Sequence, residues 1–253
     1  MQIKVINTEQ LTTYVYDTRD EMGAAAAKYA EWAINSVIAE KGHANVIFAA
    51  APSQNETLAH LLSSSVDFTR VNAFHMDEYL GLSIEDDQSF ARYLYDHVFS
   101  HAPFAAVNYI PAAQDSAGAC AGYTALLEKY PPDVVLMGIG ENGHIAFNDP
   151  PVADFADPVL IKPVALDEVC RMQQVHDGCF PDIDSVPKYA LTLTVPALMS
   201  ARYLVCTVPA PTKAQAVKAM LEGEYGEVCP ATALRKHDGA KMFLDRDSAS
   251  LVL

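Results

Sequence analysis

The stretch at residues 133–150 constrains the fold of this chain more than any other. It contains Val134–Met137, an apolar run of strand length. A run that is apolar on both faces is typical of a central strand in a parallel sheet. A glycine-rich turn that begins at Gly138 follows, and then come His144 and, five residues later, Asp149. Because ligands of open α/β sheets bind beyond the carboxyl ends of the strands, the stretch predicts a site with an imidazole and a carboxylate.

The glycines of this turn allow a ligand to approach the backbone, so Gly138 is a candidate binding residue. Residues 138–143 also form a GxGxxG pattern. No helix pattern follows it, and Pro150-Pro151 would end one, so we exclude a nicotinamide or flavin site. The histidines do not have a metal-ligand spacing and there is no HExxH motif. We therefore predict neither a cofactor nor a metal.

Apolar strand patterns and amphipathic helix patterns alternate along the chain, which predicts a three-layer α/β fold whose mostly parallel sheet has helices on both faces. No linker or repeat interrupts residues 1–253, so we expect one domain. The expected strands are residues 3–6, 45–49, 71–74, 108–110, 134–137, 203–208 and 241–244, and residues 159–164 and 190–195 should be extended with a polar stretch between them. The expected helices are residues 18–40, 53–62, 89–99, 117–129 and 211–222.

The charge and the cysteines exclude several classes of protein. The chain has 17 basic and 32 acidic residues and a net charge of −15, which argues against nucleic acid or an anionic membrane as a partner. No apolar run approaches the ~18 residues of a membrane helix, and the N-terminus does not have the pattern of a secretory signal. Five scattered cysteines without a CxxC pair indicate free thiols in a reducing cytoplasm.

Three motifs resemble a known family. Residues 143–150 (GHIAFNDP) are similar to the signature of the glucosamine-6-phosphate deaminase/isomerase family. Residues 74–82 (FHMDEYLGL) and 186–192 (VPKYALT) match two further family motifs, in the family's order and at about its spacing. The resemblance covers nearly the whole chain and implies a Rossmann-like modified fold.

The resemblance also implies catalytic roles. Asp77 matches the family's acid–base, which moves a proton between C2 and C1 of an opened amino sugar. His144 matches the residue that assists ring opening, since a neutral imidazole can shuttle protons near pH 7. Asp149 stands where the family usually has glutamate, and it would orient the imidazole. Asn142 takes a position where members carry aspartate or asparagine, and orientation suits it better than proton transfer.

The phosphate-binding residues depart from the family pattern. In the family, the phosphate-binding loop is rich in glycine and hydroxyl groups, whereas in this chain residues 51–57 read APSQNET. Ser53, Gln54 and Asn55 can still donate hydrogen bonds near a predicted helix N-terminus, although Glu56 adds a negative charge. Lys213 matches the family's phosphate lysine. The family's arginine has no clear match, and Arg171 is the candidate to replace it.

Three functions remain open at this point. The first is an isomerase–deaminase that converts glucosamine 6-phosphate, or a related hexosamine phosphate, and water to ketose 6-phosphate and ammonia. The second is a hydrolase similar to 6-phosphogluconolactonase, which shares the fold and a histidine in the equivalent loop. The third is a non-catalytic sensor of sugar phosphates. Family members are often oligomers, so the resemblance allows a homo-oligomer.

Overall fold

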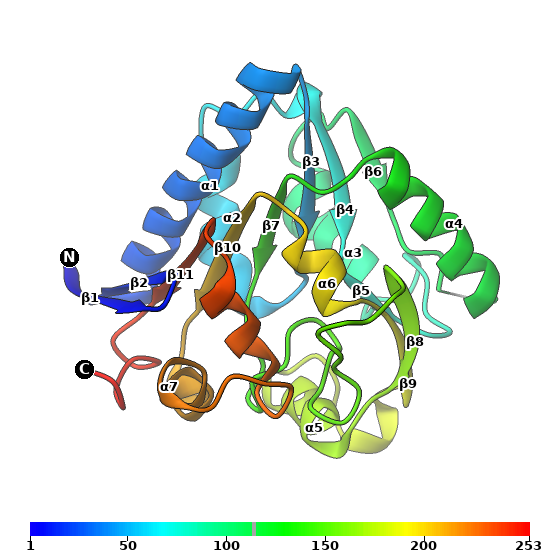
Figure 1. The fold of residues 1–253 in the computed structure, drawn as a ribbon. Coiled ribbons are helices and arrows are strands. Elements are labelled where there is room, and N and C mark those ends of the chain that lie inside the picture. The colour runs from blue at the N-terminus through cyan, green and yellow to red at the C-terminus, as the bar shows by residue number, and fades with distance from the viewer. Residues whose placement is uncertain (113–114) are drawn as a thin grey trace.

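The computed structural model describes residues 1–112 and 115–253, and its centre is an eight-stranded sheet (Figure 1). The strand order is β1-β2-β11-β10-β7-β3-β4-β6, and every neighbouring pair is parallel except β1 with β2. The strands are β1 (Gln2–Thr8), β2 (Leu11–Tyr16), β3 (Ala44–Phe48), β4 (Val71–His75), β6 (Ala106–Asn108), β7 (Val134–Met137), β10 (Tyr203–Val208) and β11 (Ala240–Leu244).

Helices cover both faces of this sheet, as predicted. One hydrophobic cluster joins the sheet to α1 (Arg19–Lys41), α2 (Asn55–Leu62) and α3 (Phe90–Leu94), and α3 continues as a π-helical turn to Phe99. The other cluster joins the opposite face to α4 (Ser116–Lys129), α6 (Val195–Met199) and α7 (Ala214–Glu222). Because alternate residues of β3 enter different clusters, the central strands are buried on both sides, which explains why they are continuously apolar.

A small second sheet, with strand order β5-β9-β8, extends from the carboxyl end of the large one. It contains β5 (Asp77–Tyr79), β9 (Tyr189–Leu193) and β8 (Ile161–Ala165), all antiparallel. The sequence predicted residues 76–82 as a loop, which is wrong for β5, because the pairing partner β9 lies more than 100 residues away. The polar stretch between β8 and β9 contains α5 (Glu168–His176), which was also not predicted.

Local hydrogen bonds explain where the helices begin and end. The Thr18 side chain accepts from the Glu21 backbone N–H at the start of α1, and Gly42 ends that helix with φ of 82°. The helix predicted from residue 53 begins two residues later: a short 3₁₀ turn, Pro52–Gln54, precedes α2, and α2 has no side-chain cap. The Ser53 hydroxyl accepts from Gln54 Nε2 at 3.2 Å, and Ser53 lines the pocket described below.

The order of the strands places the site. From β3 the chain moves outward to β4 and β6, returns to β7 beside β3, and then continues in the other direction to β10 and β11. The point between β3 and β7 is therefore a topological switch point, where ligands of such sheets bind. Among the described residues no helix is long and apolar enough to cross a membrane.

Candidate active site

A pocket lies at the switch point and collects most of the predicted site residues. It is lined by the loops that follow β3, β4 and β7, by α5 and by the turn before α7. Six of the predicted residues line it, namely Ser53, Gln54, Asp77, Gly138, His144 and Lys213. Gln173, Gln174 and Asp177, which the sequence did not identify, line it as well.

His144 is held by a tight turn and by a buried carboxylate. Its Nδ1 lies 2.9 Å from Asp149 Oδ1, and the carboxylate is almost completely buried. Gly140 donates its N–H to the His144 carbonyl at 2.9 Å. The ring lies so close to Gly140 that a Cβ there would come within 2.1 Å of His144 Cε1. Since Nδ1 faces Asp149, Nε2 is the nitrogen that can serve a ligand in the pocket.

Asn142 lies behind this pair and does not line the pocket. Its Nδ2 donates to Asp149 Oδ1 at 2.9 Å, and its Oδ1 accepts from the His144 backbone N–H at 3.0 Å. Burial opposes ionisation of Asp149, but hydrogen bonds and charge from His144, and the hydrogen bond from Asn142, hold the pKa of Asp149 below its usual value. The carboxylate is therefore ionised near neutral pH.

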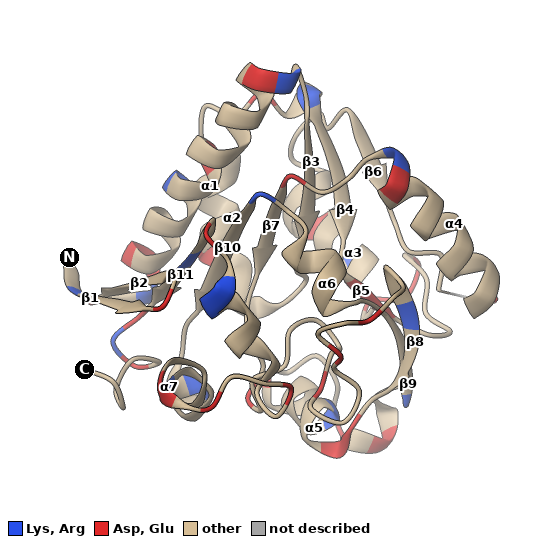
Figure 2. Cartoon of the chain, viewed as in Figure 1, with Lys and Arg blue, Asp and Glu red and all other residues tan. Residues whose placement is uncertain are grey.

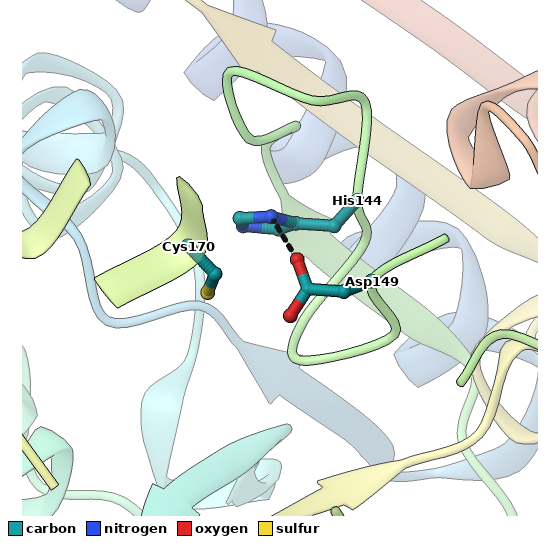
Figure 3. A group of neighbouring side chains, drawn as sticks. All are labelled: His144, Asp149 and Cys170. Atoms are coloured by element: carbon teal, nitrogen blue, oxygen red, sulfur yellow. Dashed lines mark ion pairs between the residues drawn. The ribbon is translucent and has the colours of Figure 1, made fainter. Parts of the chain in front are cut away.

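Cys170, from α5, completes a buried group with His144 and Asp149 (Figure 3). One ligand atom from each of the three lies within 4.8 Å of the other two. Such donors can hold a metal ion in general. Here burial, first of all, and the nearby Asp149 charge raise the pKa of the Cys170 thiol, so the sulfur remains protonated and acts as a small buried packing group.

Asp77 and Glu78 are neighbours in β5 with different environments. Asp77 lines the pocket, and burial, with a smaller contribution from the Glu78 charge, raises the pKa of Asp77 well above its usual value. Glu78 accepts backbone N–H bonds from Tyr79 at 2.9 Å, Phe90 at 3.1 Å and Ala91 at 2.8 Å. Glu78 thus fixes β5 to the start of α3 and holds Asp77 in place.

The 51–57 loop forms the floor of the pocket. Gln54 is buried and spans to β10, where its Oε1 accepts from Thr207 Oγ1 at 2.8 Å. A Cβ at Gly138 would lie 3.1 Å from both Gln54 Nε2 and the Thr207 carbonyl, so glycine lets the three segments meet. Glu56 does not face the pocket, because it is paired with Arg19 Nε at 2.8 Å.

Two predicted binding residues are not brought into the pocket. The Asn55 side chain is hydrogen-bonded to the Tyr93 hydroxyl. Arg171 donates to the carbonyls of Ile183 and Val186, the latter at 3.0 Å, and so stabilises the chain that follows α5. The prediction that Arg171 binds phosphate is therefore not supported by its position, which leaves Lys213 as the basic residue of the described pocket lining.

Comparisons with known proteins agree with this geometry. The family model described as glucosamine-6-phosphate isomerases/6-phosphogluconolactonase matches residues 17–243. A glucosamine-6-phosphate deaminase of Bacillus cytotoxicus is 31% identical over 239 residues, which cover 94% of this chain and 87% of that protein. One of Bacillus cereus is 33% identical with the same coverage.

Solved structures give the same result. The structure of a monomeric glucosamine-6-phosphate deaminase is similar with a TM-score of 0.86 and 31% identity, and the match covers 94% of this chain and 99% of that one. The 6-phosphogluconolactonase of Thermotoga maritima has a TM-score of 0.75 at 19% identity, with 92% and 99% covered, and supports the fold alone. The resemblance seen in the three motifs is confirmed, and the chain belongs to the glucosamine-6-phosphate isomerase/6-phosphogluconolactonase family.

Proposed function

We propose that the protein is an isomerase–deaminase that converts a hexosamine 6-phosphate, with glucosamine 6-phosphate as the reference substrate, and water to ketose 6-phosphate and ammonia. One observation supports this most strongly. A buried carboxylate with a raised pKa, Asp77, shares a pocket with the oriented imidazole of His144. The curated relatives that share about a third of the sequence carry the same activity in their names.

In the proposed reaction His144 Nε2 moves the proton between the ring oxygen and the C1 hydroxyl, which opens the pyranose. Asp149 and Asn142 hold the imidazole in position. Asp77 then takes the proton from C2, and the electron pair of that C–H bond forms the C1–C2 double bond of an enolamine. The π pair of the C1 carbonyl moves to O1, which takes up a proton from the substrate's own ammonium group. Asp77 returns the proton to C1, which leaves an iminium at C2. Water adds at C2 and ammonia leaves, so one water is consumed for each ammonia.

Burial raises the pKa of Asp77, and this upward direction suits a group that must accept and return one proton near neutral pH. Lactone hydrolysis needs no proton transfer between adjacent carbons, so the position of Asp77 favours the isomerase–deaminase over the hydrolase. An intact acid–base pair also argues against a non-catalytic sensor.

Five free cysteines fit a reducing compartment, and we place the enzyme in the cytoplasm.

The test is to measure ammonia and ketose phosphate released from glucosamine 6-phosphate by the wild type and by Asp77→Asn. We expect equal amounts of the two products and a loss of about 10²–10⁴-fold in kcat for the variant. The matched control is Asp133→Asn, which neutralises another buried carboxylate at the amino end of β7, where Asp133 pairs with Lys41. Asp133→Asn should lower stability and keep kcat. No turnover by folded wild-type protein would refute the proposal.

A further inference from the structure

The charges around the pocket are unusual for a site that binds a phosphate. The titratable residues of its described lining are Asp77, His144, Asp177 and Lys213, so a single cation is present. Lys213 is buried, and no acceptor for its ammonium group is found among residues 1–112 and 115–253. A buried ammonium that faces a pocket without a partner is available to a ligand. Any phosphate bound in this pocket would therefore have to lie at Lys213.

Asp177 places a negative charge in the same pocket. It is the residue at the C-terminal end of α5, where the helix dipole is already negative. Its Oδ2 accepts from Gln173 Nε2 at 3.3 Å, which directs the carboxylate along α5. Burial lowers the pKa of Lys213, and Asp177 gives the largest opposing electrostatic effect. Asp177 and Lys213 thus line one pocket without a direct ion pair between them, and the carboxylate reduces the positive potential that Lys213 can offer a ligand.

The other cations near the pocket are already engaged. Arg19 pairs with Glu56 and also donates to the Pro52 carbonyl. Arg171 is held by two carbonyls after α5. Residues 167–184 carry five acidic residues and one arginine, and Figure 2 shows acidic positions on α5 and on the loops beside it. In a chain of net charge −15, Lys213 is the one cation that the described lining of the pocket offers against Asp177.

The neutral residues at this end suit hydroxyl groups. Ser53 and Gln174 line the pocket, and each can both donate and accept a hydrogen bond. Gln54 also lines it, with its amide held by Ser53 and Thr207. A sugar hydroxyl could donate to the Asp177 carboxylate and accept from Lys213. A phosphate dianion has no proton to donate, and it would lie beside a carboxylate of the same sign, which costs affinity.

We propose that Asp177 is a specificity-determining residue that weakens selection for the 6-phosphate, so that the enzyme also accepts unphosphorylated 2-amino-2-deoxyhexoses. This inference rests on the proposed function for its catalytic readout. The substrate class is then hexosamines in general, with the C6 hydroxyl or its phosphate bound between Lys213 and Asp177.

The test compares kcat/KM for glucosamine 6-phosphate and for glucosamine at pH 8, where the phosphate is a dianion because its second pKa is about 6. We expect the wild type to prefer the phosphate by no more than about tenfold. Asp177→Asn should raise that ratio at least about tenfold. Asp184→Asn is the matched control, since it removes the same charge from an exposed position in the same segment, and it should leave the ratio unchanged within about twofold.

A wild-type preference above about a hundredfold would overturn the inference, and so would equal effects of Asp177→Asn and Asp184→Asn. Binding separates this inference from the reaction itself. We would titrate both sugars into Asp77→Asn, alone and combined with Asp177→Asn, by calorimetry. If the wild type turns over neither sugar, the proposed function fails, and the ratio of the two dissociation constants still tests Asp177. If neither sugar binds detectably, the proposed role of Asp177 in specificity fails as well.

Discussion

The His144 imidazole lies flat against Gly140, in the space that the side chain of any other residue would fill. A Cβ at position 140 would approach His144 Cε1 to 2.1 Å, Nε2 to 2.2 Å and Nδ1 to 2.4 Å. Real Cβ atoms do not make such contacts, so the ring would have to move. The glycine of this turn therefore positions the imidazole itself, in addition to allowing a ligand to approach the backbone.

Gly140→Ala should displace the His144 ring and lower kcat by roughly 100-fold, since a displacement of about 1 Å at a catalytic group has an effect of this size. The measurement is steady-state turnover together with a thermal unfolding curve. Gly122→Ala is the control, because position 122 lies in α4 with nothing within 4 Å of the new Cβ. It should keep full activity. Full activity of Gly140→Ala would contradict the assigned place of the ring.

The raised pKa of Asp77 predicts the pH dependence of turnover. Protonated Asp77 cannot take the C2 proton, so kcat should fall about tenfold per pH unit below this pKa. Because burial and the Glu78 charge raise the pKa, the acid limb of the profile should lie well above the range of an exposed aspartate. The limb must appear in kcat and not only in kcat/KM, since ionisation of the free substrate affects only the latter. A flat kcat down to pH 4 would exclude Asp77 as the base.

Asp149→Asn should change how stability depends on pH. The folded-state pKa of Asp149 is lowered by His144 and Asn142, so its ionised form contributes stability that is present above the unfolded-state pKa of about 4. This contribution is lost as the pH falls through the folded-state pKa. We expect Asp149→Asn to be less stable than the wild type by about 1–3 kcal/mol at pH 7. Below about pH 4 the difference should shrink.

Urea unfolding at pH 7, 5 and 3.5 measures this difference, with exposed Asp184→Asn as the control. The control should show no such dependence near neutral pH. A difference between Asp149→Asn and the wild type that stays constant over the whole range would show that the carboxylate charge contributes nothing to the pairing with His144.

Most strands of the large sheet could be predicted from the sequence because they depend on local apolar runs. The loop after β7 was predictable for the same reason, and so was the meeting of Asp77 with His144 in one pocket. The sequence predicted neither β2 nor the strand order that creates the switch point, since the order depends on pairing between distant segments. Asp177, Gln173 and Gln174 could not be found in this way, because α5 reaches the pocket through packing between distant segments. A capped helix beginning at Asp167, whose side chain accepts from the Cys170 N–H, was the available signal.

Arg171 shows why residue type does not determine a role. An arginine close to the expected phosphate site is a reasonable candidate, but its direction depends on the phase of α5 and on where residues 183–186 return. In the structure its guanidinium donates to two carbonyls there. Glu78 also shows that residue type does not determine a role. Adjacent side chains in a strand point to opposite faces, so of Asp77 and Glu78 only one can enter the pocket.

Arg171→Met should test this structural role against the predicted phosphate contact. Methionine keeps much of the length and removes the hydrogen bonds to the Ile183 and Val186 carbonyls, which should cost about 2 kcal/mol of stability. The loosened segment follows α5, so KM should rise for glucosamine 6-phosphate and for glucosamine by the same factor, while kcat changes little. Steady-state kinetics with both sugars and urea unfolding provide the measurement. A rise in KM confined to the phosphorylated sugar, without loss of stability, would show instead that Arg171 contacts the phosphate.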